Sequence, residues 1–321
     1  MDMNEHLALV IGAFLLDVAF GDPAYRFHPV RLIGNWILVS ERLLFARGRS
    51  DRRAGVIHWL MVVLGALAAW LAIHLALLLV SPALATVWDL YIAYSLLSFR
   101  GLLAQGQRVL RSLEDLPKAR EHMRMLVGRD TEPLQRDGIV RAAIESLSEN
   151  LTDGVLTPLL ALCLFGLPGL IVVKAVSTLD SMVGYKSERY RDFGWLSARS
   201  DDWTNWLPAR LSVALIALSA AFLRLHPLLA IRSALRYHAI LPSPNSGWSE
   251  AACAGALRVR LLGPVWSEGQ LVNETYMGDP DWPADLGPDH LRAALDIILI
   301  CGLLAFVLGV VVAPLRMLMP W

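Results

Sequence analysis

The stretch that decides the fold is VIHWLMVVLGALAAWLAIHLALLLV, residues 56–80. It lies within a longer run, 54–88, that contains no Asp, Glu, Lys or Arg. As a helix, such a run is long enough to cross about 30 Å of hydrocarbon. The whole 321-residue chain is 55% hydrophobic and only 18% charged, with a mean hydropathy of +0.48. This composition excludes an ordinary soluble globule and predicts an integral membrane protein.

Other apolar runs extend this prediction. Residues 297–315 form a second candidate span, and 90–99 can return the chain through the bilayer after a bend at Ser81-Pro82. The run 7–16 is shorter and has no basic residues before it, so we do not interpret it as a cleaved signal peptide. The thirteen uncharged residues between Arg210 and Arg224 suit a re-entrant or interfacial segment.

The motif FGLPGL, residues 165–170, interrupts the apolar run 154–173 with Pro168 between two glycines. A proline there removes a helix hydrogen bond, so we expect two half-helices that form a re-entrant hairpin. A single kinked span is the alternative. The predicted fold class is an all-α integral membrane protein with about four full transmembrane helices, re-entrant or interfacial helices, and helical cytoplasmic segments, in one polytopic domain, 1–321.

The basic residues are distributed unevenly, with 27 of the 29 Lys and Arg within 21–53, 100–153, 174–210 and 224–260. The positive-inside rule places these segments in the cytoplasm. We therefore predict a multi-pass protein of the cytoplasmic (inner) membrane with its active site facing the cytoplasm, and cytoplasmic-side polar segments at 21–53, 100–153, 174–210 and 224–293. The formal net charge of zero gives no reason to expect nucleic acid. The three cysteines have no metal or disulfide spacing and are interpreted as packing residues.

Two motifs carry candidate site residues before position 160. In FGDPAYRFHPVRLIGNW, 20–36, two prolines fix a loop that carries Asp22, His28 and Arg31, and such a loop can hold an anion or contact lipid headgroups. In IVRAAIESLSENLTDGVLTP, 139–158, we expect a helix up to Gly154 that puts Glu145, Glu149 and Asp153 on one face. Mg²⁺ would offset their repulsion, with Asn150 as a neutral oxygen ligand. A solvated acidic face balanced by Arg141 is the alternative.

The stretch STLDSMVGYKSERYRDFGWLSARSDDWTNWLPARL, 177–211, combines acids, bases, hydroxyls and aromatic side chains. On a helix, Lys186 and Arg189 would share a side. Cations of this kind can clamp phosphates while Asp180 and Asp202 hold a metal. A basic patch that binds anionic lipid is the alternative, but it leaves the aspartates and Asn205 unexplained.

A fourth stretch, LPSPNSGWSEAACAGAL, 241–257, begins with a proline-fixed turn that exposes Ser243, Asn245 and Ser246 and then enters a helix. Ser246 or Ser249 could cap that helix, and free amides at a helix start bind anions. No Walker-type loop, GxGxxG, HExxH or GxSxG motif occurs. A nucleotide would therefore need another kind of site.

Taken in order, FGDPAYRFHPVRLIG, VGRDT, ESLSENLTDGVLTPLL, KAVSTLDSMVGYKSERYRDFGWLSARSDDWTNWLPARL and SPNSGWSEAACAGALRVRLLGP resemble the CobD/CbiB family of cobalamin biosynthesis. The resemblance covers about residues 10–280. It implies a membrane ligase, adenosylcobinamide-phosphate synthase, which joins a corrinoid, adenosylcobyric acid, to (R)-1-aminopropan-2-ol phosphate. ATP as co-substrate and Mg²⁺ are implied with it. The oligomeric state is left open, including a homo-oligomer.

On this resemblance, each candidate residue receives a role. The expected catalytic residues are Asp180, Lys186, His28 and Asp202, with His28 or Asp202 as the general base. The expected substrate or phosphate contacts are Arg31, Tyr185, Arg189, Asn205, Arg210, Ser243 and Asn245. The expected metal ligands are Glu145, Asn150 and Asp153, with Asp180 as a further candidate.

The chain departs from the family pattern at two places. The histidine expected just before Ser-Pro-Asn is His238, here separated from Ser243 by AILP, and the tyrosine-glycine element expected after Gly263-Pro264 is missing. Two other classes of function remain to be weighed. An AmpE-like signalling protein would not need the intact tyrosine-lysine-arginine block, and a transporter would place charges at mid-membrane within inverted repeats, of which we see none.

Overall fold

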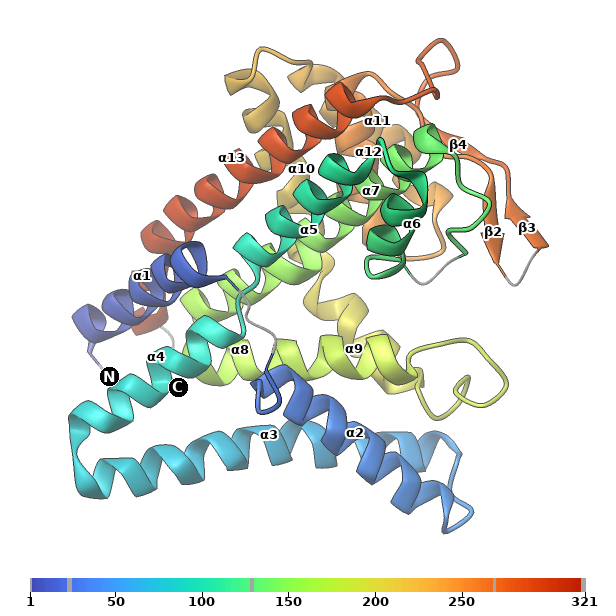
Figure 1. Cartoon of the computed structure of the whole chain (residues 1–321). Coiled ribbons are helices and arrows are strands. Elements are labelled where there is room, and N and C mark those ends of the chain that lie inside the picture. The colour runs from blue at the N-terminus through green and yellow to red at the C-terminus, as the bar shows by residue number, and fades with distance from the viewer. Residues whose placement is uncertain (1, 22–24, 128–129, 268–269, 319–321) are drawn as a thin grey trace. The chain divides into compact units, whose positions relative to one another are not determined.

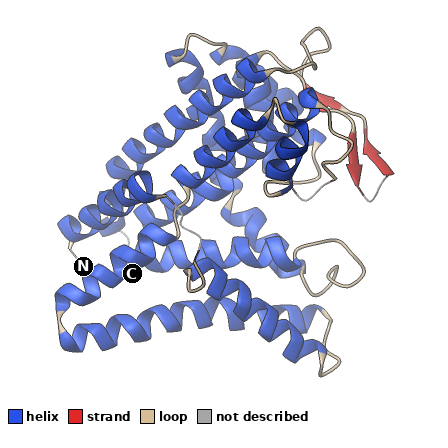
Figure 2. Ribbon diagram, viewed as in Figure 1, coloured by secondary structure: helices blue, strands red, loops and turns tan. Residues whose placement is uncertain are grey.

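The computed structural model describes residues 2–21, 25–127, 130–267 and 270–318 of the chain. Within these ranges the regular structure is helical apart from two small two-stranded antiparallel sheets (Figures 1 and 2). Five helical stretches are long and apolar enough to cross a membrane: Met3–Phe20, Arg52–Val80, Arg136–Val183, Trp195–Phe222 and Pro288–Arg316. The chain is therefore an all-α integral membrane protein, as its sequence predicts.

The described chain divides into two compact units that interleave in sequence. Unit 1 comprises 1–98, 157–205 and 306–321, and unit 2 comprises 99–156 and 206–305. Neither unit is a continuous segment, since the chain passes between them after residues 98, 156, 205 and 305. That 1–321 acts as a single membrane domain stays a prediction.

Unit 1 contains the helical hairpin predicted from the opening stretch. Its elements are α1 (Met3–Phe20), α2 (Pro29–Phe45), α3 (Arg52–Val80), α4 (Pro82–Ser95), α8 (Thr157–Val183), α9 (Trp195–Thr204), the 3₁₀ segment η3 (Ala313–Leu318) and the end of α13 (Pro288–Val312). The Asp51 side chain caps α3 by accepting a hydrogen bond from the Ala54 N–H at 3.0 Å. Helix α3 ends at Ser81, and Pro82 occupies the first turn of α4.

Helix α1 is longer than the apolar run 7–16. It begins with a capping box in which the Asp2 carboxylate accepts from the Glu5 N–H and the Glu5 carboxylate accepts from the Asp2 N–H. Asp17 lies inside the helix as a buried residue. The helix therefore continues beyond the apolar run at both ends and includes charged residues. The stretch long enough to cross a membrane begins at Met3.

Helix α8 is broken within the FGLPGL motif, as predicted, but at Gly166 and not at Pro168. Gly166 has φ 68° and ψ −161°, a conformation that is essentially restricted to glycine. Pro168 lies at the beginning of the second part of α8, where a missing N–H costs little. A Cβ on Gly169 would lie 2.4 Å from the Phe165 Cβ, so the chain packs tightly across the break.

Unit 2 is built around an alanine-rich helix, α12, most of whose residues are buried. Its elements are α5 (Phe99–Ser112), α6 (Leu116–Arg124), α7 (Arg136–Asn150), the π-helix η1 (Leu151–Leu156), α10 (Trp206–Phe222), α11 (Pro227–Tyr237), the 3₁₀ turn η2 (His238–Ile240), α12 (Ser246–Leu257), β1 (Leu261–Leu262), β2 (Val265–Ser267), β3 (Gln270–Asn273), β4 (Tyr276–Met277) and α13 as far as Ala305. Strand β1 pairs with β4, and β2 pairs with β3. A Cβ on Gly255 would lie 2.2 Å from the Leu229 carbonyl oxygen, so glycine lets α11 and α12 approach closely.

Two further predictions can be compared with the helices. All three cysteines are free and buried, which confirms them as packing residues. The run 211–223 is not a separate short segment, because α10 begins at Trp206 and α9 ends just before it at Thr204. Together Trp195–Phe222 is long enough to cross a membrane, so the prediction from the uncharged run alone underestimated the helix.

Candidate functional site

The predicted site residues fall into two groups, one in each unit. Unit 1 holds His28, Arg31, Asp180, Tyr185, Lys186, Arg189, Asp202 and Asn205. Unit 2 holds Glu145, Asn150, Asp153, Arg210, Ser243 and Asn245. Asp22 lies outside the described residues.

The first group centres on the loop 184–194, which follows α8. Lys186 and Arg189 would share a side on a helix, but this segment is a series of turns, so the helical spacing does not apply. Lys186 and Tyr185 are exposed, and the Tyr185 hydroxyl donates to the Ser181 carbonyl at 2.8 Å. The loop therefore leaves the Lys186 ammonium group exposed.

Asp180, near the end of α8, lies against Gly184 at the start of this loop. The Gly184 N–H donates to the Asp180 carbonyl at 2.7 Å, and a Cβ on Gly184 would lie 1.9 Å from the Asp180 Oδ1. Asp180 also interacts electrostatically with Asp202 of α9, which in turn interacts with Lys186 and Arg199. The structure thus brings three of the four predicted catalytic residues into one electrostatic cluster.

A buried glutamate on α2, Glu41, anchors the loop and was not identified from the sequence. Its Oε1 accepts from Arg189 Nη2 at 2.7 Å and from the Tyr190 hydroxyl at 3.0 Å. Burial raises the pKa of Tyr190, and the bond to Glu41 adds to the effect, so Tyr190 stays a donor. Arg189 therefore serves to hold the loop, and its role as a phosphate contact stays a prediction.

A second anchor lies at the other end of the loop. Arg52, at the start of α3, forms an ion pair with Asp192 at 3.0 Å and lies 5.4 Å from the ring centroid of Trp195. The pair is half exposed, so it contributes little to stability. With Glu41, it fixes the loop to α2 and α3 on both sides of Tyr190.

Asn205 connects the beginning of α8 to α9. It is buried, accepts from the Thr157 hydroxyl at 2.5 Å and donates to Asp201 Oδ2 at 2.9 Å. Both ends of its amide are used in the fold. That Asn205 contacts substrate stays a prediction.

His28 and Arg31 occupy the first turn of α2 in different surroundings. His28 is buried at the N-cap position, with the Tyr25 ring edge-on to it at 5.3 Å between centroids. Arg31 is exposed and lines a cavity of about 490 Å³ together with Arg26, Asn35 and Met182. Met182 belongs to α8, so this cavity extends to the helix that carries Asp180.

In unit 2, two of the predicted motifs line one cavity of about 320 Å³. Glu145, Ser146 and Glu149 come from α7, and Ser243, Ser246 and Glu250 come from the segment around the start of α12. Glu145 is buried, and its Oε1 accepts from the Leu262 N–H at 2.8 Å. This carboxylate therefore holds β1 as well as lining the cavity.

The expected acidic face of α7 is interrupted by the π-helix. Regular α-helix ends at Asn150, not at Gly154, and Asp153 lies in the π-helix η1, so the constant α-helical spacing that we assumed for Glu145, Glu149 and Asp153 does not hold. Asn150 Nδ2 donates to the Ser146 carbonyl at 2.8 Å. Neither Asn150 nor Asp153 lines the 320 Å³ cavity.

This donor set limits the kind of metal site that the residues could form. Within the described ranges, no three His, Cys, Asp or Glu side chains come together as a metal-binding group. A cage of carboxylates is therefore not supported. Mg²⁺ usually binds through one or two carboxylates plus substrate phosphates, and Glu145 in its cavity fits that smaller requirement.

Arg210 and Asn245 meet in an aromatic cluster of unit 2. Arg210 Nη1 donates to Asn245 Oδ1 at 3.1 Å, and its guanidinium lies 4.3 Å and 5.0 Å from the ring centroids of Trp206 and Trp248. The His238 ring stacks on Trp248 at 3.9 Å. The AILP insertion therefore leaves His238 beside the Ser-Pro-Asn segment.

The Ser-Pro-Asn turn is organised by Ser243. Its hydroxyl accepts from the N–H groups of Asn245 and Ser246, at 3.2 and 3.3 Å. We had expected Ser246 or Ser249 to cap α12, but neither does. The N-cap residue is Asn245, whose side chain makes no capping hydrogen bond, while Ser249 bonds back to the Ser246 carbonyl.

Comparison with known proteins shows which family the chain belongs to. The model of the CobD/Cbib protein family matches residues 10–298. The cobalamin biosynthesis protein CobD of Geobacter metallireducens is 44% identical over 286 residues, covering 88% of this chain and 90% of the relative. The protein of the same name from Klebsiella pneumoniae is 40% identical, covering 92% and 94%, and cobalamin biosynthesis protein CbiB of Salmonella arizonae is 39% identical, covering 89% and 91%. No solved structure matches the chain. Since the match spans all the motifs described above, the chain belongs to the CobD/CbiB family.

Proposed function

We propose that this protein acts in cobalamin biosynthesis as an ATP-dependent carbon–nitrogen ligase. It would join the free carboxyl group of adenosylcobyric acid to the amine of (R)-1-aminopropan-2-ol phosphate, giving adenosylcobinamide phosphate. The observation that carries this proposal is the family match over residues 10–298 together with relatives named for cobalamin biosynthesis. The helices that can span a membrane support a membrane-embedded enzyme.

The proposed reaction fits the kinds of residues in unit 1. A carboxylate does not react with an amine until its oxygen becomes a good leaving group, which transfer of a phosphoryl group from ATP provides. Positioning and charge neutralisation dominate such transfers. Lys186 is exposed on an anchored loop and is suited to contact a phosphate, as is Arg31 at the 490 Å³ cavity.

The amine must also lose a proton before or during attack on the activated carboxyl group. Asp202 is half-buried and interacts with Lys186, one of the two proposed phosphate contacts, so it is the candidate base that we favour. His28 is the second candidate, although its burial leaves less room for direct contact with substrate. When bound, Mg²⁺ would neutralise phosphate charge, with Glu145 as the protein ligand that we favour.

The proposal is tested with purified protein in detergent, given Mg-ATP, adenosylcobyric acid and aminopropanol phosphate, with mass spectrometry for the amide product. We expect product only when all three are present. If folded protein forms no product and binds neither the corrinoid nor ATP, the ligase proposal fails. The AmpE-like signalling function would then be the better explanation of the family likeness.

A further inference from the structure

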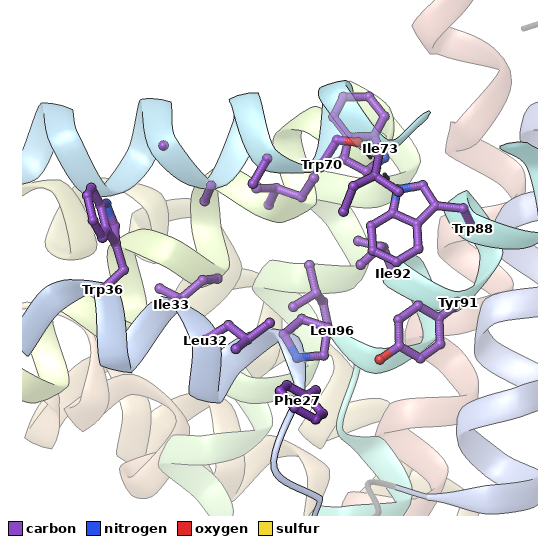
Figure 3. A pocket seen from close by; sticks show the side chains of 15 residues that line it. Phe27, Leu32, Ile33, Trp36, Trp70, Ile73, Trp88, Tyr91, Ile92 and Leu96 are labelled. Carbon is purple, nitrogen blue, oxygen red and sulfur yellow. Dashed lines mark hydrogen bonds between the residues drawn. The ribbon is translucent and has the colours of Figure 1, made fainter. Parts of the chain in front are cut away.

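Unit 1 contains a cavity of about 600 Å³ that none of the predicted site residues lines (Figure 3). Helices α2, α3 and α4 form its walls, with Ile171 of α8. On α3, the small residues Gly65, Ala66 and Ala69 leave the space open. Figure 3 shows Trp36 at one end of the α3 wall and Trp70 at the other. The cavity thus runs along a helix that is long enough to cross a membrane.

The aromatic side chains that line this cavity have their polar atoms engaged within the protein. Their hydrogen bonds are Trp36 Nε1 to the Met61 carbonyl at 3.0 Å, Trp70 Nε1 to Asp89 Oδ1 at 2.9 Å, Trp88 Nε1 to the Trp70 carbonyl at 3.3 Å, and the Tyr91 hydroxyl with that of Tyr25. Ring carbons and aliphatic groups are left to face the cavity. Such a lining suits a hydrocarbon chain better than a ligand rich in hydrogen-bonding groups.

The cavity is open to the surroundings of α3. Only 11% of the most apolar window of α3 is buried within the protein, so this helix has much surface that lipid could contact. Leu32 and Trp36 on α2 are 48% and 40% exposed, and Ile73 on α3 is 43% exposed. Water does not fill an apolar space in the hydrocarbon region, because it finds too few polar partners there. A lipid chain is the available occupant.

Opposite charges lie on two sides of the cavity. On the side away from α3, Phe27 lines the cavity (Figure 3), and the Arg26 guanidinium lies 5.7 Å from its ring centroid. Beside Trp70 on α3, Asp89 accepts from Trp70 and from His74 Nδ1. An amphiphile with a negative head would therefore be favoured with its head at Arg26 and its tail towards Trp70.

We propose that this cavity is a lipid-binding site that holds one acyl chain of an anionic phospholipid, with the phosphate at Arg26. None of the predicted site residues lines this cavity, while Arg26 also lines the 490 Å³ cavity together with Arg31. The proposal does not rest on the ligase function. It predicts a retained lipid, distinct from the exchangeable lipids around the transmembrane surface.

The test is native mass spectrometry of delipidated full-length protein titrated with palmitoyl-oleoyl phosphatidylglycerol. We expect the wild type to keep one lipid per chain under activation that removes the others. Ala69→Phe, which fills the cavity from α3, should lose that lipid. Ala68→Phe makes the same change at an exposed position of α3 that does not line the cavity, and it should keep the lipid.

Further arms of the experiment separate the chain from the headgroup. Phosphatidylcholine with the same chains should be retained at least threefold less than phosphatidylglycerol, and Arg26→Gln should remove this difference. Ala69→Leu gives a milder filling variant if Ala69→Phe does not elute as a single folded species. Equal lipid retention by the wild type and a folded cavity-filling variant would overturn the proposal. Displacement of the lipid by soluble glycerol phosphate would overturn it too, because the headgroup alone would then account for binding.

Discussion

At the scale of single residues, Lys186 and Asp180 provide the sharpest test of the proposed chemistry. Lys186 is exposed, and Asp180 can be replaced by the isosteric Asn beside Gly184, so neither change should unfold the protein. We expect Lys186→Ala and Asp180→Asn each to lower kcat about 100-fold or more, as losses of transition-state charge stabilisation do. Amide formation is measured in detergent, with Lys118→Ala on α6 as the matched control. A variant with normal activity would remove its residue from the mechanism.

Glu145 allows a structural role to be separated from a role in binding metal. Glu145→Gln keeps an oxygen that accepts from the Leu262 N–H but loses the charge, whereas Glu145→Ala leaves that buried N–H without this acceptor. We expect the Ala variant to lose about 1–3 kcal/mol of stability and the Gln variant to lose little. If Glu145 binds Mg²⁺, the Gln variant should require more Mg²⁺ for half-maximal turnover. An unchanged Mg²⁺ requirement would assign Glu145 to the fold alone.

At the scale of elements, the break in α8 depends on Gly166. Any other residue there would adopt a conformation that costs about 1–3 kcal/mol, and its Cβ would lie 2.6 Å from Arg316 Nη1. Arg316 also hydrogen-bonds to His6 at 3.1 Å, so the break is packed against both termini of unit 1. We expect Gly166→Ala to lower the Tm measured by thermal unfolding in detergent. Gly287→Ala, where a Cβ meets nothing within 4 Å, should leave it almost unchanged.

The same elements show how far the sequence could predict the structure. The α3–α4 hairpin and the break within FGLPGL follow from local signals: an uncharged run, a serine-proline bend, and glycines beside a proline. Glu41 could not be found that way, because its partner Arg189 lies 148 positions further along the chain. The acidic face of α7 was predicted with a constant helical period, and the π-helix at Leu151–Leu156 changes that period just before Asp153. Contacts distant in sequence and irregular turns therefore account for most of the differences.

At the scale of the whole molecule, the positive-inside argument predicts which polar segments share one side of the membrane. It requires the loop 184–194 and the Ser-Pro-Asn turn to face the cytoplasm, together with Ser50 between α2 and α3. The beginning of α4, which includes Ala83, should face the opposite side. The break at Gly166 fits both a re-entrant hairpin and a single kinked span, and of the two only the hairpin returns the chain to the side from which it came.

Cysteine labelling tests this sidedness directly, with probe positions chosen from the structure. Ser187, Pro244 and Ser50 are exposed, as is Ala83, whereas Ser148 and Ser246 are buried and would label poorly. The native cysteines are buried and should contribute little background. With a membrane-impermeant maleimide, we expect Ser187→Cys, Pro244→Cys and Ser50→Cys to react only in inside-out vesicles, and Ala83→Cys only in intact cells. Reaction of Ser187→Cys and Pro244→Cys from opposite sides would contradict the re-entrant arrangement.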